Sequence, residues 1–470
     1  MDFSQYSIWE GMLHFGLLAL LLLTGNVLRR KVPLLRKSLL PTAVIAGFLG
    51  LAIKDIILVH ILSASEYEHS VNILRVITYH AIALGFIALG LKTRAAVKVK
   101  AKKDRSIFSG LLIVSTYMIQ GLIGLILSIT MAYTIFPSLF KASGLLLPMG
   151  FGQGPGQAQN IGSVYELEHG FAGGTTFGLA IASFGFIWAS VAGIIYLNML
   201  YKNKKLFKST QARRHLVSAQ EIDTPDEIPV AEAIDKFTVQ VALVLMVYVF
   251  TYLFIFMIKT LVGNGLFGDF GESTVLPLVI GFNFIFGMLF ALLFKHIFIF
   301  FRKINIMTRQ YPNNFMLNRI AGTVFDFMIV ASIAAIRIED LKSLWIPFLI
   351  MTIVIGFVTL FFVIYMTKRI YPEYPLEASL GMFGMLTGTA STGIILLREA
   401  DPNFETPVAN DLVVGSSTAI LFGFPILLLV GIAPMGTLQT FVSLGIIIIL
   451  FTGMVSAILY FNPRIKKDTP

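Results

Sequence analysis

The stretch PMGFGQGPGQAQN at residues 148–160 contains four glycines and two prolines, and it lies between long apolar runs. Glycine permits sharp reversals of the backbone, and proline lacks the N–H that a helix needs, so no continuous helix is expected here. A second stretch, GMLTGTASTG at residues 384–393, combines glycine with threonine and serine in similar surroundings. We predict that both form the tips of re-entrant hairpins, at about 142–168 and 376–400, because unpaired backbone at membrane depth persists only inside protein or beside a wet cavity.

The composition around these stretches is that of a membrane protein. Of 470 residues, 56% are hydrophobic and only 13% are charged, with a mean hydropathy of +0.82. Apolar windows near the roughly 20 residues that cross a bilayer recur along the chain, and in lipid each must be a helix. The strands of a β-barrel alternate and never run apolar for so long. The sequence therefore predicts an all-α polytopic membrane protein. The predicted spans are residues 8–28, 39–58, 71–92, 107–136, 172–201, 236–262, 274–295, 319–337, 343–368, 411–432 and 438–461.

Basic residues set the predicted orientation. Lysine and arginine cluster in every second loop, beginning after the first span, and the intervening loops are nearly bare. Because basic loops stay cytoplasmic, the N-terminus is expected outside and the C-terminus inside the plasma (cytoplasmic) membrane, provided that neither hairpin crosses fully. The net charge of +10 then reflects topology, and no nucleic-acid partner is expected. Without cysteine there is no disulfide, Cys-ligated zinc or thiol nucleophile. The first span lacks a basic leader and is expected to be retained.

The two halves of the chain share short patterns at nearly one offset. Phe151-Gly152, Gly156 and Ala158 match Phe383-Gly384, Gly388 and Ala390 as F-G-x-x-x-G-x-A, and Leu40-Pro41 resembles Leu276-Pro277. Together with opposite topologies, these matches predict an inverted structural repeat, which is common in secondary transporters. The alternative is chance similarity between small-residue helix contacts. The predicted parts are a first repeat at 1–201, a cytoplasmic linker at 202–235, a second repeat at 236–432, and an additional helix and tail at 433–470.

The predicted tips offer groups for an anion and for a hard cation. A half-helix that starts at such a break presents free N–H groups and a positive dipole end, which suits a carboxylate. Unwound carbonyls and hydroxyls suit sodium. The alternative is that these polar groups only satisfy broken backbone. The candidate substrate-binding residues are Gly152, Gln153, Gly154, Gly156, Gln157, Asn160, Gly388, Thr389, Ser391 and Thr392, with Gln159 nearby. The candidate cation-binding residues are Thr387, Thr389 and Asp326.

Asp326 lies near the centre of the predicted span at 319–337. An ionised carboxylate there costs on the order of 2.5 to 3.5 kcal/mol even on the mild insertion scale, so it needs a partner or a role. We favour a cation or proton site, or a contact to a substrate amino group, over a protonated packing residue. Arg337 and Arg398 lie near helix ends, where side chains reach the interface, and are expected to orient helices more than to bind an anion.

The paired tips and the five spans per half resemble the sodium/glutamate symporter (ESS) family, with the sodium/citrate carriers as a more distant likeness. That family carries a G-G-x-G-T type motif in each hairpin, and Gly152 to Gly156 and Gly384 to Thr389 occupy the equivalent places. Gln153 and Pro155 interrupt the first motif, and the last helix looks like an addition. The resemblance implies sodium-coupled uptake of glutamate by a homodimer, with sodium as the coupling ion and no other cofactor.

The resemblance also implies an elevator-like alternating-access mechanism. The expected moving core consists of the hairpins and the third to fifth and eighth to tenth spans. Other functions stay open. A sodium-coupled citrate or dicarboxylate carrier would want more cationic residues at the tips. An ion channel commonly needs a ring of equivalent groups. An enzyme is not expected, since no G-x-S-x-G, H-E-x-x-H or phosphate-loop signature is present.

Overall fold

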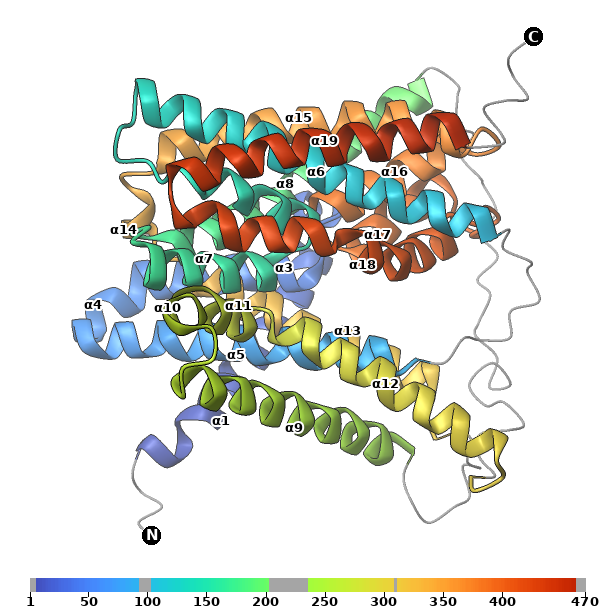
Figure 1. The fold of residues 1–470 in the computed structure, drawn as a ribbon. Coiled ribbons are helices and arrows are strands. Elements are labelled where there is room, and N and C mark those ends of the chain that lie inside the picture. Colours follow the sequence, from blue (N-terminus) through green and yellow to red (C-terminus); the bar gives the residue numbers. More distant parts are fainter. Residues whose placement is uncertain (1–5, 93–102, 203–235, 308–310, 462–470) are drawn as a thin grey trace. The chain divides into compact units, whose positions relative to one another are not determined.

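The computed structural model describes residues 6–92, 103–202, 236–307 and 311–461, and this part of the chain contains helices and no strand (Figure 1). The all-α fold class is thereby confirmed. Most of the predicted linker at 202–235 lies outside these ranges. The helices are α1 (Tyr6–Lys31), α2 (Pro33–Lys37), α3 (Thr42–Ile53), α4 (Val59–Ile61), α5 (Ala64–Leu91), α6 (Lys103–Thr134), α7 (Pro155–His169), α8 (Gly174–Lys202), α9 (Lys236–Gly263), α10 (Gly268–Phe270), α11 (Leu276–Gly281), α12 (Asn283–Lys303), α13 (Asn314–Ala334), α14 (Ile338–Leu341), α15 (Trp345–Ile370), α16 (Pro375–Thr387), α17 (Ala390–Ala400), α18 (Val408–Ile432) and α19 (Thr437–Phe461).

Ten helical segments in the described ranges are long and apolar enough to cross a membrane. They correspond to ten of the predicted spans, and α18 occupies the place of the remaining one. Three boundaries were wrong by five residues or more. α5 begins at Ala64 and α13 at Asn314, where the predicted starts were 71 and 319. The span predicted at 274–295 is interrupted at Phe282, directly after α11 ends at Gly281, and α12 continues to Lys303. The prediction ended the helix at Lys295, but the apolar run resumes beyond His296, and a single lysine can extend its ammonium to the interface without ending a helix.

The described helices divide between two compact units. Unit 1 comprises Met1–Leu74, Lys100–Ala212 and Ser332–Pro470, and unit 2 comprises Arg75–Val99 and Arg213–Ala331. Both predicted hairpins belong to unit 1. The spans predicted at 71–92 and 319–337 were expected to move with the hairpins, but most of α5 and α13 belongs to unit 2. Sequence spacing does not reveal this grouping, because each of these two helices contributes residues to both units.

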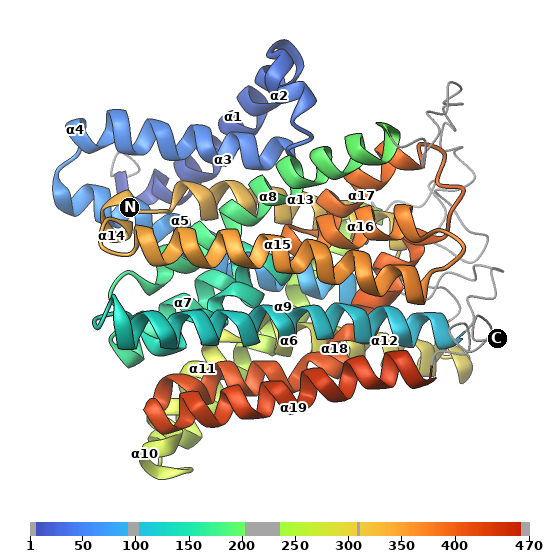
Figure 2. The ribbon, with the colours of Figure 1, turned by 90° about the horizontal axis from the view of Figure 1, so that it is seen from above.

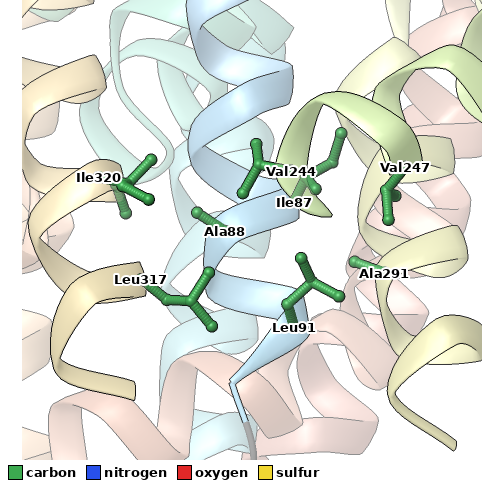
Figure 3. Close-up of a cluster of buried hydrophobic side chains, with 9 residues drawn as sticks. Ile87, Ala88, Leu91, Val244, Val247, Ala291, Leu317 and Ile320 are labelled. Atoms are coloured by element: carbon green, nitrogen blue, oxygen red, sulfur yellow. The ribbon is translucent and has the colours of Figure 1, made fainter. Parts of the chain in front are cut away.

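Unit 2 has its own apolar core. Its members come from α5, α9, α12 and α13, and the labelled side chains converge between these helices (Figure 3). Small residues let the helices approach closely: a Cβ added to Gly90 would lie 2.8 Å from Ala291 Cβ, and one added to Gly85 would collide with the Phe325 ring. Such contacts are how membrane helices associate without a hydrophobic driving force between them. The buried members are Ile87, Ala88, Leu91, Val244, Val247, Ala291, Leu317, Ile320 and Ala321.

Unit 1 is organised around α6. This helix packs along α15, α18 and α19, and Figure 2 shows it running between α15 and α19. Glycine again sets the closest approaches: a Cβ on Gly124 would lie 2.3 Å from Gly144 O, and one on Gly415 would lie 2.8 Å from Ser109 Cβ. The Ser109 and Tyr371 hydroxyls lie 2.7 Å apart and join α6 to the end of α15. The two broken segments pack against α6 and its neighbouring helices.

Lys54, in the π-helical turn that follows α3, is buried and joins this turn to the segment after α13 within unit 1. Lys54 Nζ lies 3.0 Å from Asp55 Oδ1, and it donates to Tyr67 Oη at 2.9 Å and to Ile336 O at 2.5 Å. The Tyr67 hydroxyl donates to Asp55 Oδ1 at 2.6 Å. Every donor of the ammonium therefore has an acceptor, which is the condition for keeping a lysine in an interior. Close by, Arg337 holds Glu68 through two bonds of 2.8 and 3.1 Å.

We expect Lys54→Met to destabilise the protein by about 3 kcal/mol, because the change leaves the Asp55 carboxylate buried with one remaining donor. The melting temperature in detergent should fall by several degrees. The double variant Lys54→Met/Asp55→Asn should recover much of that loss, since no charge remains. Lys342→Met removes an exposed pair with Glu339 and serves as the control, with no measurable change expected. Equal melting temperatures for the single and double variants would contradict the assignment of the loss to an unpaired charge.

Candidate substrate and cation site

The first break lies between η3 (Pro148–Gly152), a π-helical turn, and α7. Gln153 N still bonds to Pro148 O at 3.1 Å, and the chain then turns at Gly154 with φ +96° and ψ −179°. This conformation is essentially restricted to glycine. Pro155 opens α7 at the position where its missing N–H costs nothing. The helix break predicted from the glycine and proline pattern is therefore present, and it falls at Gln153 and Gly154.

The second break separates α16 from α17. Gly388 adopts φ −145° and ψ −102°, and Thr389 is extended and makes no side-chain cap for the helix that follows. The Thr387 hydroxyl donates back to Phe383 O at 2.6 Å, and the Thr389 and Thr392 hydroxyls lie 3.3 Å apart. The two helices pack closely, since a Cβ on Gly393 would lie 2.5 Å from Gly381 O. The segment thus forms a tight helical pair with hydroxyls at its turn.

The two breaks meet within unit 1. A Cβ added to Gly154 would lie 3.7 Å from Thr389 Cγ2 and 3.8 Å from Gly388 O. Helix α8 covers the second break, because a Cβ on Gly185 would lie 2.3 Å from Thr387 O. The N-terminal ends of α7 and α17 are therefore close to one another. Neither stretch 148–160 nor 384–393 contains a charged residue, and the N-terminus of each helix carries the positive end of its dipole.

Most predicted tip residues are buried at or beside this meeting point. Gln153 and Thr389 are half-buried, and Ser391 is exposed on the first turn of α17. Gln157 belongs to the first turn of α7 and Asn160 to the next, and each is less than 5% exposed. The arrangement offers uncapped backbone N–H groups, hydroxyls and amides, a set that suits a carboxylate and a hard cation. The buried tip residues are Gly152, Gly154, Gly156, Gln157, Gln159, Asn160, Thr387, Gly388 and Thr392.

Asp326 lies on α13 in unit 2, and the structure does not bring it together with the tips in one unit. Its side chain is exposed and has no hydrogen-bond or ion-pair partner among the described residues. It continues a polar, exposed face of the helix that also carries Asn318, Arg319 and Thr323. A lipid-facing stripe of this kind would be costly, so the face belongs beside protein or water. The assignment of Asp326 as a cation-binding residue stays a prediction.

One polar residue beside the breaks, Gln120, was not among the residues predicted for the site. Gln120 on α6 is fully buried and donates from Nε2 to Leu386 O at 3.0 Å, one residue before Thr387. Its Oε1 lies 2.9 Å from the position of a Cβ on Gly152. The signal that could have found it was a lone amide in the middle of an apolar span, which in a membrane helix is expected to face protein.

Within the described part of the chain, no group of three or more carboxylates or imidazoles could hold a metal.

The architecture defines the class of this protein as a polytopic membrane protein with two broken helical segments that meet in unit 1. Comparison with protein families then narrows the class, since the sodium/glutamate symporter family matches residues 11–395. The chain belongs to the sodium/glutamate symporter family. The match ends within α17 and leaves out α18 and α19. A search of curated protein sequences found no match to the chain.

We expect Gly154→Ala to reduce transport by at least tenfold. A Cβ at this position meets only ordinary contacts, so the damage comes from the backbone, whose conformation costs alanine on the order of 1 to 3 kcal/mol and moves the tip. Gly170→Ala is the matched control, because Gly170 also has a positive φ, of +71°, but ends α7 with nothing within 4 Å. Uptake per folded protein in proteoliposomes is the measurement. Equal losses in both variants would show that the conformation of the tip does not matter for transport.

Proposed function

We propose that this protein is a secondary active transporter that carries glutamate or a similar small carboxylate together with sodium. The observation that supports this most directly is the meeting of two uncapped helix N-termini in one buried place. Backbone N–H groups there bind a carboxylate without a fixed positive side chain. Di- and tricarboxylates without an amino group would call for arginine or lysine at the tips, and neither stretch contains one. This favours an amino acid over citrate.

Sodium is the proposed coupling ion. Hydroxyl and carbonyl oxygens are the ligands of hard cations, and they surround the second break at Thr387, Gly388, Thr389 and Thr392. A cation beside a bound carboxylate also neutralises it, which lowers the cost of keeping both ligands out of bulk water. Broken helices that hold substrate and ion together are a recurring arrangement in secondary transporters. The proposal assigns no chemical reaction to the protein.

We extend the proposal to an elevator-like mechanism in a homodimer of the plasma membrane, with the N-terminus outside. The support for a moving body is the division into two compact units, with both breaks in unit 1 and a separate apolar core in unit 2. The support for the orientation is the alternation of basic loops. The dimer and the inverted repeat rest on the resemblance of the chain to the family and on the repeated F-G-x-x-x-G-x-A pattern.

Purified protein in proteoliposomes should accumulate labelled glutamate when an inward sodium gradient is imposed, and should accumulate little with potassium in its place. The physical reason is that the gradient supplies energy only if sodium and substrate cross together. Gly388→Ala should reduce the accumulation, because its Cβ would lie 3.0 Å from Thr392 Oγ1 and 3.1 Å from Phe186 Cδ1 and would displace these side chains. Absence of glutamate uptake with either cation would refute the substrate and lead to tests of citrate and other dicarboxylates.

Asp326→Asn should abolish glutamate uptake or uncouple it from sodium, because the substitution removes the one carboxylate on the polar face of α13 while keeping its shape. The control is Asp269→Asn, which changes an exposed carboxylate of the same unit in the short helix α10. The measurement is the sodium dependence of uptake for both variants. Unchanged sodium-dependent transport by Asp326→Asn would refute a role for this carboxylate in coupling.

A further inference from the structure

Gln120 lies beside both breaks and has no role in the proposed function described above. Its side chain is fully buried on α6, and Nε2 donates to Leu386 O at 3.0 Å and to Thr359 Oγ1 at 3.1 Å. A backbone carbonyl only accepts hydrogen bonds, so the amide nitrogen must be the atom that faces Leu386. This fixes the orientation of the amide, which leaves Oε1 directed the other way.

The Oε1 atom points at the first break. It lies 2.9 Å from the position of a Cβ on Gly152, and the Tyr117 ring approaches the same glycine even more closely. Only glycine leaves room for this oxygen beside the backbone. Oε1 is buried and has no hydrogen-bond partner in the described residues. A buried acceptor without a partner is rare in folded proteins, because its lost hydration is not replaced.

The position of Gln120 connects the two breaks. The nitrogen end of the amide is bound to the last turn of α16, just before Gly388, and the oxygen end lies over Gly152, just before Gly154. The missing partner of Oε1 must be a donor or a cation. Amide oxygens are common ligands of hard cations, and the neighbouring helix N-termini favour a carboxylate whose charge a cation would balance. Pro155 has no N–H, so the first break itself supplies no donor from that residue.

We propose that Gln120 Oε1 is a ligand of the transported sodium ion, and that the bond from Nε2 to Leu386 O ties this ion to the second break. The inference rests on the proposed function, since it assigns a further residue to the same site. It places sodium against α6 and the first break, in addition to the hydroxyls of the second. Occupancy of the site then holds both broken segments in one arrangement, which is what coupling of ion and substrate requires.

The test compares Gln120→Leu with Gln240→Leu. Gln240 is the matched control, because it is 1% exposed and both ends of its amide are satisfied, with Nε2 donating to Tyr311 O at 2.9 Å and Asn313 N donating to Oε1 at 3.0 Å. It belongs to unit 2, whereas both breaks belong to unit 1. The measurement is the sodium concentration that gives half-maximal glutamate uptake. We expect Gln120→Leu to raise it by at least about tenfold, equivalent to about 1.4 kcal/mol, and Gln240→Leu to leave it unchanged.

Two more variants distinguish a sodium ligand from a residue that only holds the two broken segments together. Gln120→Glu keeps an oxygen over Gly152 and should show a half-saturating sodium concentration closer to that of the wild type than Gln120→Leu does. Thr359→Val removes one partner of Nε2 but leaves Oε1, and should not change sodium affinity. Sodium-dependent thermal stabilisation without substrate provides a second readout on purified protein, and it should be lost in Gln120→Leu and kept in Thr359→Val.

The outcomes distinguish this inference from the function on which it rests. If the wild-type protein shows no sodium-dependent uptake, the proposed function fails and the inference fails with it. If the wild type is sodium-driven and Gln120→Leu keeps the wild-type sodium affinity with only a lower maximal rate, the inference alone is overturned. A raised KM for glutamate with unchanged sodium affinity also overturns it, since Oε1 would then contact the amino group of the substrate.

Discussion

The pairing of every backbone N–H and C=O group is the constraint on which this structure depends. In hydrocarbon an unpaired backbone group cannot form a hydrogen bond with water, so a chain that contacts lipid is helical there. The two breaks, at Gln153–Gly154 and Gly388–Thr389, interrupt the helical pairing of backbone groups. They persist because they lie against other helices: α6 and α8 contact both broken segments. The position of the site is therefore decided by where the protein can enclose irregular backbone.

Glycine makes this enclosure possible, and it acts mostly through close approach. At the two breaks, Gly154 alone has a positive φ, in a conformation that only glycine adopts readily. Elsewhere the absence of a Cβ lets backbone touch backbone, as between Gly178 and Ala158 O, Gly185 and Thr387 O, and Gly393 and Gly381 O. These contacts hold the breaks between α8 and their own neighbouring helices. The breaks can then keep their N–H groups and hydroxyls for ligands.

Much of this architecture follows from local sequence. Long apolar runs predict the helices, and the concentration of glycine and proline predicts the breaks, because both signals act over a few residues. The interruption at Phe282 also carries a local signal, because Gly281 ends α11, but the prediction ran one span through it. Two features do not follow. The pairing of Lys54 with Ile336 O joins residues far apart in sequence. The contact of Gln120 with Leu386 O likewise depends on which helices pack together, and it became visible only in three dimensions.

The chemical character of the site bears on the proposed mechanism. Its candidate ligands are dipoles, namely backbone N–H groups, hydroxyls and amides, with no charged side chain in either tip. On the proposed function, a carboxylate alone or sodium alone would bring an uncompensated charge into a poorly hydrated place, which costs several kcal/mol per ion. Together the two ions cancel much of that cost. A site built from neutral groups then binds sodium and the carboxylate together more readily than it binds either ion alone. After both ions are released, no fixed charge remains in the site. On this proposal, sodium and substrate are coupled because the site has no charged residue that could balance either ion alone. Gln120 is consistent with this proposal, since its Oε1 is a neutral oxygen beside the first break.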